Sequence, residues 1–381
     1  MLASQRELFD IPRDICYLNS ASYSPLPLRT QEAARAAVGR KGAPWTLDAA
    51  FANRQHERAR AAAARLINAE ASDVALISSV SYGVATVGKI LAIPAGMRVL
   101  VLENDHSSPI LEWQTRAASA GFTVETVRQP PDGDWTSAVM AAIERPGAPR
   151  LALASISSVH WSDGGLIDIA KVGAALKRHG ALFLIDATHA IGVLAMDVKS
   201  LDPDFVIFPT YKWLLGPYGR AFIYMAKRHQ NGIPLEQTGF GRREIRSDAE
   251  IYFADVSYVP TARRFDMGER DHFISMEMAA IGMEMMAEWG TEAVAGRLAV
   301  LTARIAEALG GTKVRLMETR FRAPHVLSLG FAGGLPTGLI EGLAADGVYV
   351  APRLSRMRIS PHVFNDEEDA DRFVAALKKR I

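Results

Sequence analysis

Short apolar runs alternate with helical stretches through the middle of this chain. Six runs, each ended by polar or turn residues, are typical of buried strands: residues 74–77, 98–102, 150–154, 182–185, 205–208 and 221–224. Strands that alternate with helices in this way favour βαβ units, so we predict a mostly parallel sheet.

Helical patterns also flank this region on both sides. They begin near Arg29 and cover about residues 50–67, 274–309 and 366–379. We therefore predict an α/β fold whose mostly parallel central sheet is joined by a second, smaller α+β domain. The expected divisions are an N-terminal arm at residues 1–20, a large domain at 21–260 and a small domain at 261–381, to which the arm also contributes.

Two polar residues, Asp186 and Lys212, follow neighbouring runs of the predicted sheet. Open α/β sheets place their ligand groups just past the carboxyl ends of the strands, so we expect this carboxylate and this amine side by side. The pair suits pyridoxal phosphate, because a lysine forms the Schiff base and an acid keeps the pyridine nitrogen protonated. Burial beside Trp213, Leu214 and Leu215 would lower the pKa of the lysine toward the neutral amine that attacks an aldehyde. Taken singly, Lys212 could be a surface lysine and Asp186 a helix N-cap.

The hydroxyl-rich segment Ser78-Ser79-Val80-Ser81-Tyr82-Gly83 follows the first run and opens a helical stretch. Small hydroxyl residues at a strand-to-helix junction leave backbone N–H groups and a helix dipole directed at an anion. We therefore predict that Val80, Ser81 and Tyr82 help to hold the cofactor phosphate. The alternative is a serine cap that begins a helix and binds nothing.

Three histidines follow predicted strands and are candidates for cofactor contacts. His106 could stack its ring on the cofactor or move a proton, and His189 could hydrogen-bond the phenolic oxygen of the cofactor. His160 is a further candidate, beyond the run at residues 150–154. Each could instead be a histidine held by backbone groups or exposed in a loop.

Candidates for substrate binding lie near both ends of the chain. Alternation along a predicted strand puts Arg356, Arg358 and Ser360 on one face. The guanidinium fork of Arg358 could bind a substrate carboxylate through two hydrogen bonds, with Arg353 as its rival and a water-facing arginine as the alternative. Asn19 could line the pocket for the substrate side chain.

Composition narrows the class of protein. The 381 residues are 49% hydrophobic, enough to bury one large core or two. The net charge of +1 gives no electrostatic reason to expect nucleic acid or an anionic membrane as a partner. No apolar stretch approaches the ~20 residues of a membrane span, and residues 1–7 lack the pattern of a secretion signal. The single cysteine, Cys16, excludes an internal disulfide framework, so we expect a cytoplasmic protein.

Motifs for other cofactors are missing from the sequence. No His-Glu-x-x-His segment and no cysteine–histidine cluster indicates a metal site. The segment Gly239-Phe240-Gly241-Arg242 lacks the third glycine of a dinucleotide fingerprint. This disfavours a nicotinamide-dependent dehydrogenase, which is a rival enzyme on an α/β fold.

Taken in order, these segments resemble the class V aminotransferase family of fold type I pyridoxal-phosphate enzymes, which includes cysteine desulfurases and isopenicillin epimerase-like proteins. The likeness covers nearly the whole chain and is most specific at Asp186-Ala187-Thr188-His189-Ala190 and at Tyr211-Lys212-Trp213-Leu214-Leu215-Gly216-Pro217. The resemblance implies a homodimer with each active site at the subunit boundary. It also implies roles for single residues: Lys212 as the Schiff-base lysine, Asp186 as the pyridinium partner, His189 near the phenolic oxygen, His106 stacked on the ring, Ser81 at the phosphate and Arg358 at the substrate carboxylate.

Three departures from the family pattern matter. The residue before the lysine is usually a histidine that contacts the phosphate; here it is Tyr211, which can still donate one hydrogen bond. The neighbouring subunit often supplies a Gly-Thr pair to the phosphate, and the matching stretch here is Gly268-Glu269-Arg270. Desulfurases that pass sulfur through a cysteine carry it on a loop before the terminal strand. Cys16 lies at the opposite end of the chain, so we expect no such transfer.

These residues predict an enzyme that forms an external aldimine with an α-amino carboxylate and removes its α-proton through Lys212. The resulting quinonoid leads to transamination, to loss of a β-substituent or to epimerisation, all with the same core residues. Transamination is our first prediction, because no leaving-group acid or transfer thiol is visible. A Cβ lyase, such as a C–S lyase, and an amino-acid epimerase are the alternatives. A binding or regulatory protein that keeps the fold without turnover is the alternative from another class.

Overall fold

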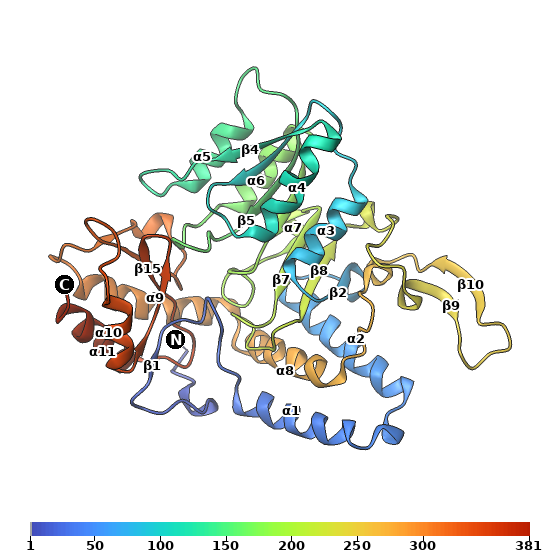
Figure 1. Cartoon of the computed structure of the whole chain (residues 1–381), viewed down its shortest axis with the longest axis horizontal. Helices are drawn as coiled ribbons and strands as arrows, with labels where there is room; N and C mark the ends of the chain where they lie inside the picture. Colours follow the sequence, from blue (N-terminus) through green and yellow to red (C-terminus); the bar gives the residue numbers. More distant parts are fainter. Residues whose placement is uncertain (1) are drawn as a thin grey trace.

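A seven-stranded sheet forms the centre of the computed structural model, which describes residues 2–381 (Figure 1). Its strands are β2 (Val74–Ile77), β3 (Arg98–Leu102), β4 (Thr123–Val127), β5 (Leu151–Ser157), β6 (Leu182–Asp186), β7 (Phe205–Pro209) and β8 (Ala221–Met225). Their order across the sheet is β2-β8-β7-β6-β5-β3-β4. The neighbours from β7 to β4 are parallel, whereas β8 runs antiparallel to both β7 and β2. The predicted α/β fold with a mostly parallel central sheet is therefore confirmed.

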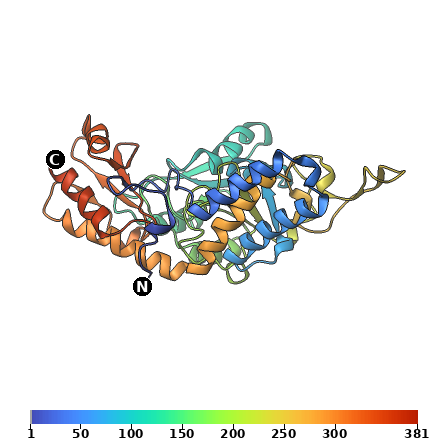
Figure 2. The same ribbon diagram turned by 90° about the horizontal axis from the view of Figure 1, so that it is seen from below.

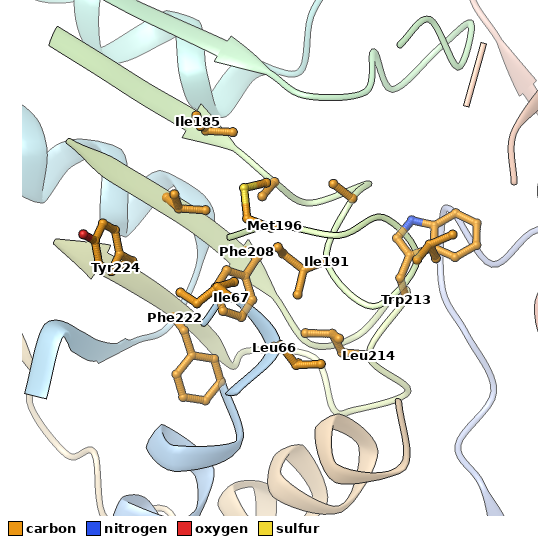
Figure 3. Close-up of a cluster of buried hydrophobic side chains, with 14 of the residues drawn as sticks. Leu66, Ile67, Ile185, Ile191, Met196, Phe208, Trp213, Leu214, Phe222 and Tyr224 are labelled. Carbon is orange, nitrogen blue, oxygen red and sulfur yellow. The ribbon is translucent and has the colours of Figure 1, made fainter. Parts of the chain in front are cut away.

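Helices bury both faces of this sheet. They are α2 (Ala49–Leu66), α3 (Val80–Ile90), α4 (Ser107–Ala120), α5 (Trp135–Ile143), α6 (Ile169–Arg178), the short α7 (Val198–Leu201) and α8 (Phe273–Trp289). Along β7, Phe205 and Ile207 pack in one core with side chains of α3 and α4, while Val206 and Phe208 pack in the other core with α2, α5, α6 and α8. Figure 3 shows Phe208 among side chains of this second core. Because alternate side chains are buried on opposite faces, the strand reads as a continuous apolar run.

The helix α8 packs against α2 and against α1 (Leu28–Lys41) beside the sheet (Figure 2). Its buried side chains are spread around the helix, as expected of a helix enclosed by other elements. The helical patterns predicted between residues 274 and 309 are two helices, α8 and α9 (Thr291–Ala308), which are separated by Gly290 with φ of +79°.

A smaller unit contains a four-stranded antiparallel sheet in the order β11-β12-β15-β14. Its elements are β11 (Arg315–Leu316), β12 (Leu327–Gly330), α10 (Leu339–Ala345), β13 (Val348–Tyr349), β14 (Ala351–Arg353), β15 (Arg356–Ile359) and α11 (Glu367–Lys378). The N-terminal strand β1 (Cys16–Tyr17) pairs with β13, and Cys16 and Leu18 lie in the core of this unit. The predicted boundary at residue 260 stays a prediction, and the core of the large sheet includes side chains of α8 that lie beyond it.

An antiparallel hairpin of β9 (Arg242–Ile245) and β10 (Phe253–Tyr258) projects from the body of the molecule (Figure 1). Its tip exposes Ile251, Tyr252 and Phe253. Within residues 2–381, no helix is both long and apolar enough to cross a membrane.

Candidate active site

The carboxyl ends of β6 and β7 bring Asp186 and Lys212 to the wall of one cavity of about 250 Å³. Asp186 is the last residue of β6, beside Ile207 of β7. Lys212 follows β7 in a turn that is closed by two hydrogen bonds of Thr210: its carbonyl accepts from the Gly216 N–H over 2.9 Å, and its Oγ1 donates to the Pro217 carbonyl over 2.8 Å. The structure thus places the two residues together, as the strand pattern predicted.

The amine of Lys212 is deeply buried, with a residue exposure of 7%. Burial, together with the nearby positive charge of Arg358, lowers the pKa of Lys212 to about 7, although Asp186 opposes the shift. Nζ lies 3.2 Å from Nε2 of His189. At neutral pH a large fraction of this lysine is therefore the free amine that attacks an aldehyde.

Asp186 is 4% exposed, and its Oδ1 accepts a hydrogen bond from the backbone N–H of Thr188 over 2.9 Å. The segment after Asp186 forms turns rather than a regular helix, so the aspartate is not a helix N-cap. Its carboxylate lies in the cavity wall, where it can pair with a protonated ring nitrogen.

Hydroxyl groups and a helix N-terminus form the opposite end of the cavity. Ser79 caps α3, since its Oγ accepts from the Tyr82 N–H over 3.1 Å, and Val80 and Ser81 in the first turn line the cavity. The N–H groups of a first helical turn have no partner inside the helix, and they favour an anion. The prediction for Tyr82 is corrected, because its N–H is used by Ser79 and its side chain lies beside Glu236, outside the cavity wall.

Two of the three predicted histidines, His106 and His189, line the cavity. Nδ1 of His106 accepts from the Ser108 N–H at the start of α4, and the ring meets Trp161 edge-on with the ring centres 6.0 Å apart. Burial lowers the pKa of His106, which favours its neutral ring.

His160 lies outside the cavity, which corrects its prediction as a cofactor contact. Its Nδ1 is 3.1 Å from Oδ1 of Asp163, its Nε2 is 3.1 Å from the Glu103 carbonyl, and its ring stacks on Trp135 with a 4.7 Å centroid distance. Both ring nitrogens thus contact other residues of the chain and are not free for a cofactor. The adjacent Trp161 lines the cavity instead.

Arg358 is buried next to the cavity rather than in its wall. Its Nη1 donates to the Trp161 carbonyl over 2.6 Å and its Nη2 to Ser22 Oγ over 3.0 Å. Asn19, predicted to line the pocket, instead lies behind Ser22: its Oδ1 accepts from the Ser22 hydroxyl over 2.7 Å. Asn19 therefore contacts Ser22 and not the cavity, which corrects the prediction of direct contact.

Tyr211 lines the cavity, and its ring packs against that of Tyr218 with the centres 4.5 Å apart. In the stretch that matches the usual Gly-Thr phosphate pair, Glu269 stands in place of the threonine, and Arg270 pairs with Asp266 of its own chain. Gly268 is also held within the chain, because its N–H donates to Glu236.

Several residues of the site escaped the sequence analysis. Ser157 lines the cavity at the end of β5, which extends three residues beyond the predicted run because serines interrupt its apolar pattern. Asp105 lies beneath it and accepts from Ser157 Oγ over 2.8 Å and from the His106 N–H over 2.8 Å. Burial raises the pKa of Asp105 to about 6. Asp105 could have been found from the sequence, because it directly precedes the candidate His106.

The residues of this cavity fit pyridoxal phosphate. The serine hydroxyls and the α3 N-terminus suit a phosphate, Asp186 suits the pyridine nitrogen, and Lys212 suits the aldehyde. Thr188 Oγ1, in the same wall, is buried without a hydrogen-bond partner among residues 2–381 and could bind a polar group of the cofactor.

Larger hollows of about 550 and 740 Å³ contain none of the predicted site residues. In the part of the chain that the structure describes, no cluster of three or more acidic, histidine or cysteine side chains could hold a metal ion.

Comparisons with known proteins agree with this arrangement. The family model described as aminotransferase class-V matches residues 17–373. An uncharacterized aminotransferase of Bacillus subtilis is 28% identical over 326 residues, which are 82% of this chain and 80% of that protein. The apo structure of the cysteine desulfurase from Thermococcus onnurineus has a TM-score of 0.85 at 19% identity and covers 100% of this chain and 98% of its own. A cystine C–S lyase in complex with its product cysteine persulfide has a TM-score of 0.84 at 19% identity. The match covers 96% of this chain and 97% of the lyase chain.

Proposed function

The chain belongs to the class-V aminotransferase family and is a pyridoxal-phosphate-dependent enzyme, and on this premise we propose that it is an aminotransferase acting on an α-amino carboxylate. The observation that carries this proposal is the shared cavity of Lys212 and Asp186, with the guanidinium of Arg358 beside it. These three groups suit, in turn, the aldehyde, the ring nitrogen and the substrate carboxylate.

The chemistry that pyridoxal phosphate supplies when bound is an aldehyde for condensation with amines and a ring that withdraws electrons from the substrate α-carbon. Asp186 would hold the protonated ring nitrogen through its buried carboxylate. Within the cavity, the buried amine of Lys212 would accept the substrate α-proton at Nζ. Its lowered pKa of about 7 lets the same nitrogen take up and return a proton near neutral pH.

Transamination is the reaction that the cavity wall supports best. It moves one proton between two carbons on one side of the cofactor and expels no side-chain group, so a single amine suffices. Among the described residues, Asp186 supplies the one carboxylate of the cavity wall, and it serves the ring nitrogen. The thiol of Cys16 is buried in the core of the smaller unit, where it donates to the Asp369 carbonyl, so it cannot accept sulfur from a substrate in this cavity.

A Cβ–S lyase is the second candidate, and one observation favours it. The ring of His106 lies in the cavity wall and could hold the proton that a leaving thiolate needs. The cysteine desulfurase and the C–S lyase that share the fold act on carbon–sulfur bonds, which supports this candidate as well.

The proposal is tested with the purified protein, loaded with pyridoxal phosphate and incubated with a panel of amino acids, with and without a 2-oxo acid. An aminotransferase converts the amino acid to its oxo acid and forms an equal amount of the new amino acid, and only with the 2-oxo acid present. Release of pyruvate without a 2-oxo acid, together with sulfide from cysteine or with cysteine persulfide from cystine, supports the lyase instead. Loss of optical purity alone would identify an epimerase.

The Lys212→Ala variant checks the central residue of the proposal. We expect borohydride reduction to fix the cofactor to the unmodified protein and to the exposed-lysine control Lys171→Ala, but not to Lys212→Ala. Cofactor fixed equally well to Lys212→Ala would contradict the proposed role of this lysine. A protein that binds pyridoxal phosphate at Lys212 but converts no amino acid would fit the non-catalytic alternative.

We also propose a homodimer, as the family resemblance implies. The projecting hairpin of β9 and β10 supports this, because an isolated two-stranded hairpin with an apolar tip is marginally stable in water. Light scattering after gel filtration measures the mass directly, and a single-chain mass of 41.4 kDa would contradict the dimer. The cytoplasmic location stays a prediction.

A further inference from the structure

We propose that Trp213 is a positioning residue that fixes the tautomer of His189, so that His189 presents the N–H of Nε2 to Lys212. The part of this inference that concerns catalysis rests on the proposed function, whereas the tautomer itself does not. Trp213 directly follows Lys212 in the chain, and its side chain lies at the edge of the buried cluster in Figure 3.

The hydrogen bond between the two side chains determines which nitrogen of His189 carries the proton. Nε1 of Trp213 lies 3.1 Å from Nδ1 of His189, and both side chains are buried. An indole nitrogen is a donor and has no acceptor function, so Nδ1 of His189 must be the acceptor. The neutral His189 ring then carries its proton on Nε2.

This assignment agrees with the charge of the surroundings. Burial and the neighbouring charge of Lys212 hold the pKa of His189 well below its usual range, so the ring is neutral. Nε2 lies 3.2 Å from Nζ of Lys212. A donor at Nε2 faces the lone pair of the free amine, and it is also a donor for an acceptor oxygen that enters the cavity, such as the phenolic oxygen of pyridoxal phosphate.

Two further buried histidines hold this pair in place. The ring of Trp213 stacks on His362, with centres 5.5 Å apart and an interplanar angle of 27°, and meets His325 edge-on at 4.4 Å and 84°. Nε2 of His325 lies 2.7 Å from the His189 carbonyl, and Nε2 of His362 lies 3.3 Å from the Trp213 carbonyl. A carbonyl oxygen only accepts, so each of these nitrogens must donate to it. The two histidines therefore fix the backbones of His189 and Trp213 as well as the indole ring.

The chain offers a matched control for the indole N–H. Trp113 is also fully buried, but its Nε1 has no hydrogen-bond partner within residues 2–381. Replacing either tryptophan by phenylalanine removes an N–H and part of a ring from a core. Only Trp213→Phe removes a hydrogen bond to His189.

The tautomer is measured in the protein without cofactor, by nuclear magnetic resonance of isotope-labelled histidine, with His189→Gln used to assign the signals. We expect His189 to carry its proton on Nε2 in the unmodified protein and in Trp113→Phe. Trp213→Phe is expected to show a mixture of tautomers or the Nδ1–H form. A proton on Nδ1 in the unmodified protein overturns the proposal even if Trp213→Phe does not fold, and so does an unchanged His189 signal in a folded Trp213→Phe.

The catalytic part is measured with the loaded enzyme as a double-mutant cycle. Loss of one buried hydrogen bond is expected to lower kcat roughly 5- to 10-fold in Trp213→Phe and to shift the pKa seen in the cofactor absorbance. In the His189→Gln background the same tryptophan replacement should change kcat less than twofold, because the residue through which it acts is gone. Equal effects in both backgrounds would show that Trp213 acts through packing alone. If the protein takes up no cofactor, the proposed function fails while the tautomer result stands.

Discussion

Arg353 and Arg358 donate hydrogen bonds to the same atom, the hydroxyl oxygen of Ser22, over 2.5 and 3.0 Å. Their other hydrogen bonds go to backbone carbonyls, and within the described residues the Nε of each is buried without a partner. Burial and the charge of Arg353 lower the pKa of Arg358 to about 9. Two guanidinium groups that share one neutral hydroxyl form a site that an anionic group would stabilise.

We therefore predict that Arg358→Ala raises KM for an α-amino carboxylate roughly 10- to 100-fold, the loss expected for hydrogen bonds to a charged group. Arg353→Ala should also raise KM, but by a smaller factor, because Arg353 is only partly buried. Steady-state kinetics with the amino acid and with the matching amine that lacks the carboxylate provide the measurement. Neither substitution should change the KM of the amine.

Arg356→Ala serves as the control, since Arg356 lines a different hollow, next to Arg315 and Phe331. Its KM should equal that of the unmodified enzyme. If Arg358→Ala raised the KM of the amine as much as that of the amino acid, the arginine would not bind the carboxylate.

The buried amine of Lys212 should give cofactor capture an unusual pH dependence. Its pKa of about 7 means that the ammonium form dominates below that pH and the reactive amine above it. The rate of Schiff-base formation with pyridoxal phosphate should therefore rise about tenfold per pH unit up to about pH 7 and then level off. Stopped-flow absorbance from about pH 5 to about pH 9 measures this profile.

Replacing Arg358 by Gln should move that profile. Removal of a positive charge stabilises the ammonium form, so the midpoint should shift to higher pH. A rate that keeps rising through pH 9 in the unmodified protein would indicate an ordinary exposed lysine and contradict the burial of Nζ.

The turn that carries Lys212 rests on a glycine of α8. A Cβ atom at Gly282 would lie 2.2 Å from the Leu214 carbonyl oxygen, which a real contact cannot tolerate. We expect Gly282→Ala to lower the free energy of unfolding by about 1–3 kcal/mol and to weaken cofactor binding, because the turn must move. Denaturant unfolding and cofactor titration are the measurements.

Gly296 of α9 is the matched control, because it is exposed on a helix and a Cβ there meets nothing within 4 Å. Gly296→Ala should raise the free energy of unfolding by about 0.5–1 kcal/mol, the difference in helix propensity between the two residues. Changes of the same sign at both glycines would contradict the close approach at Gly282.

A buried ion pair supports the strand that leads to the hydroxyl-rich segment. Arg60 of α2 donates from Nη1 and Nη2 to the two carboxylate oxygens of Asp266 over 3.0 and 2.8 Å, and both side chains are fully buried. The same carboxylate accepts from the N–H of Leu76 in β2 over 2.9 Å. Arg60→Met should lower the free energy of unfolding by about 3 kcal/mol, because it leaves a buried carboxylate short of one partner.

The exposed pair of Arg320 and Glu318 gives the comparison. Arg320→Met should change the free energy of unfolding by less than about 1 kcal/mol, since a solvated ion pair contributes little. Urea unfolding of both variants tests the difference, and equal effects would mean that burial does not determine the strength of these pairs.

Most strands of the large sheet could be predicted from the sequence, whereas β4 could not. The two-sided burial of β7 makes every position apolar, so its limits are visible in the sequence. The strand β4 lies at the sheet edge beside β3, and its exposed Thr123 and polar Glu125 break any apolar run.

The candidate site likewise contains residues that the sequence predicts and residues that it does not. The sequence by itself determined the mostly parallel sheet and the places where Asp186 and Lys212 leave it, because buried strands are recognisable locally and parallel strands end at one edge. The tertiary structure alone decided that Trp161 rather than His160 meets the cavity, that Ser22 joins Arg353 to Arg358, and that Trp213 donates to His189. Such contacts join residues far apart in the chain or depend on the direction of a side chain, and neither is set by the local pattern of apolar and polar positions.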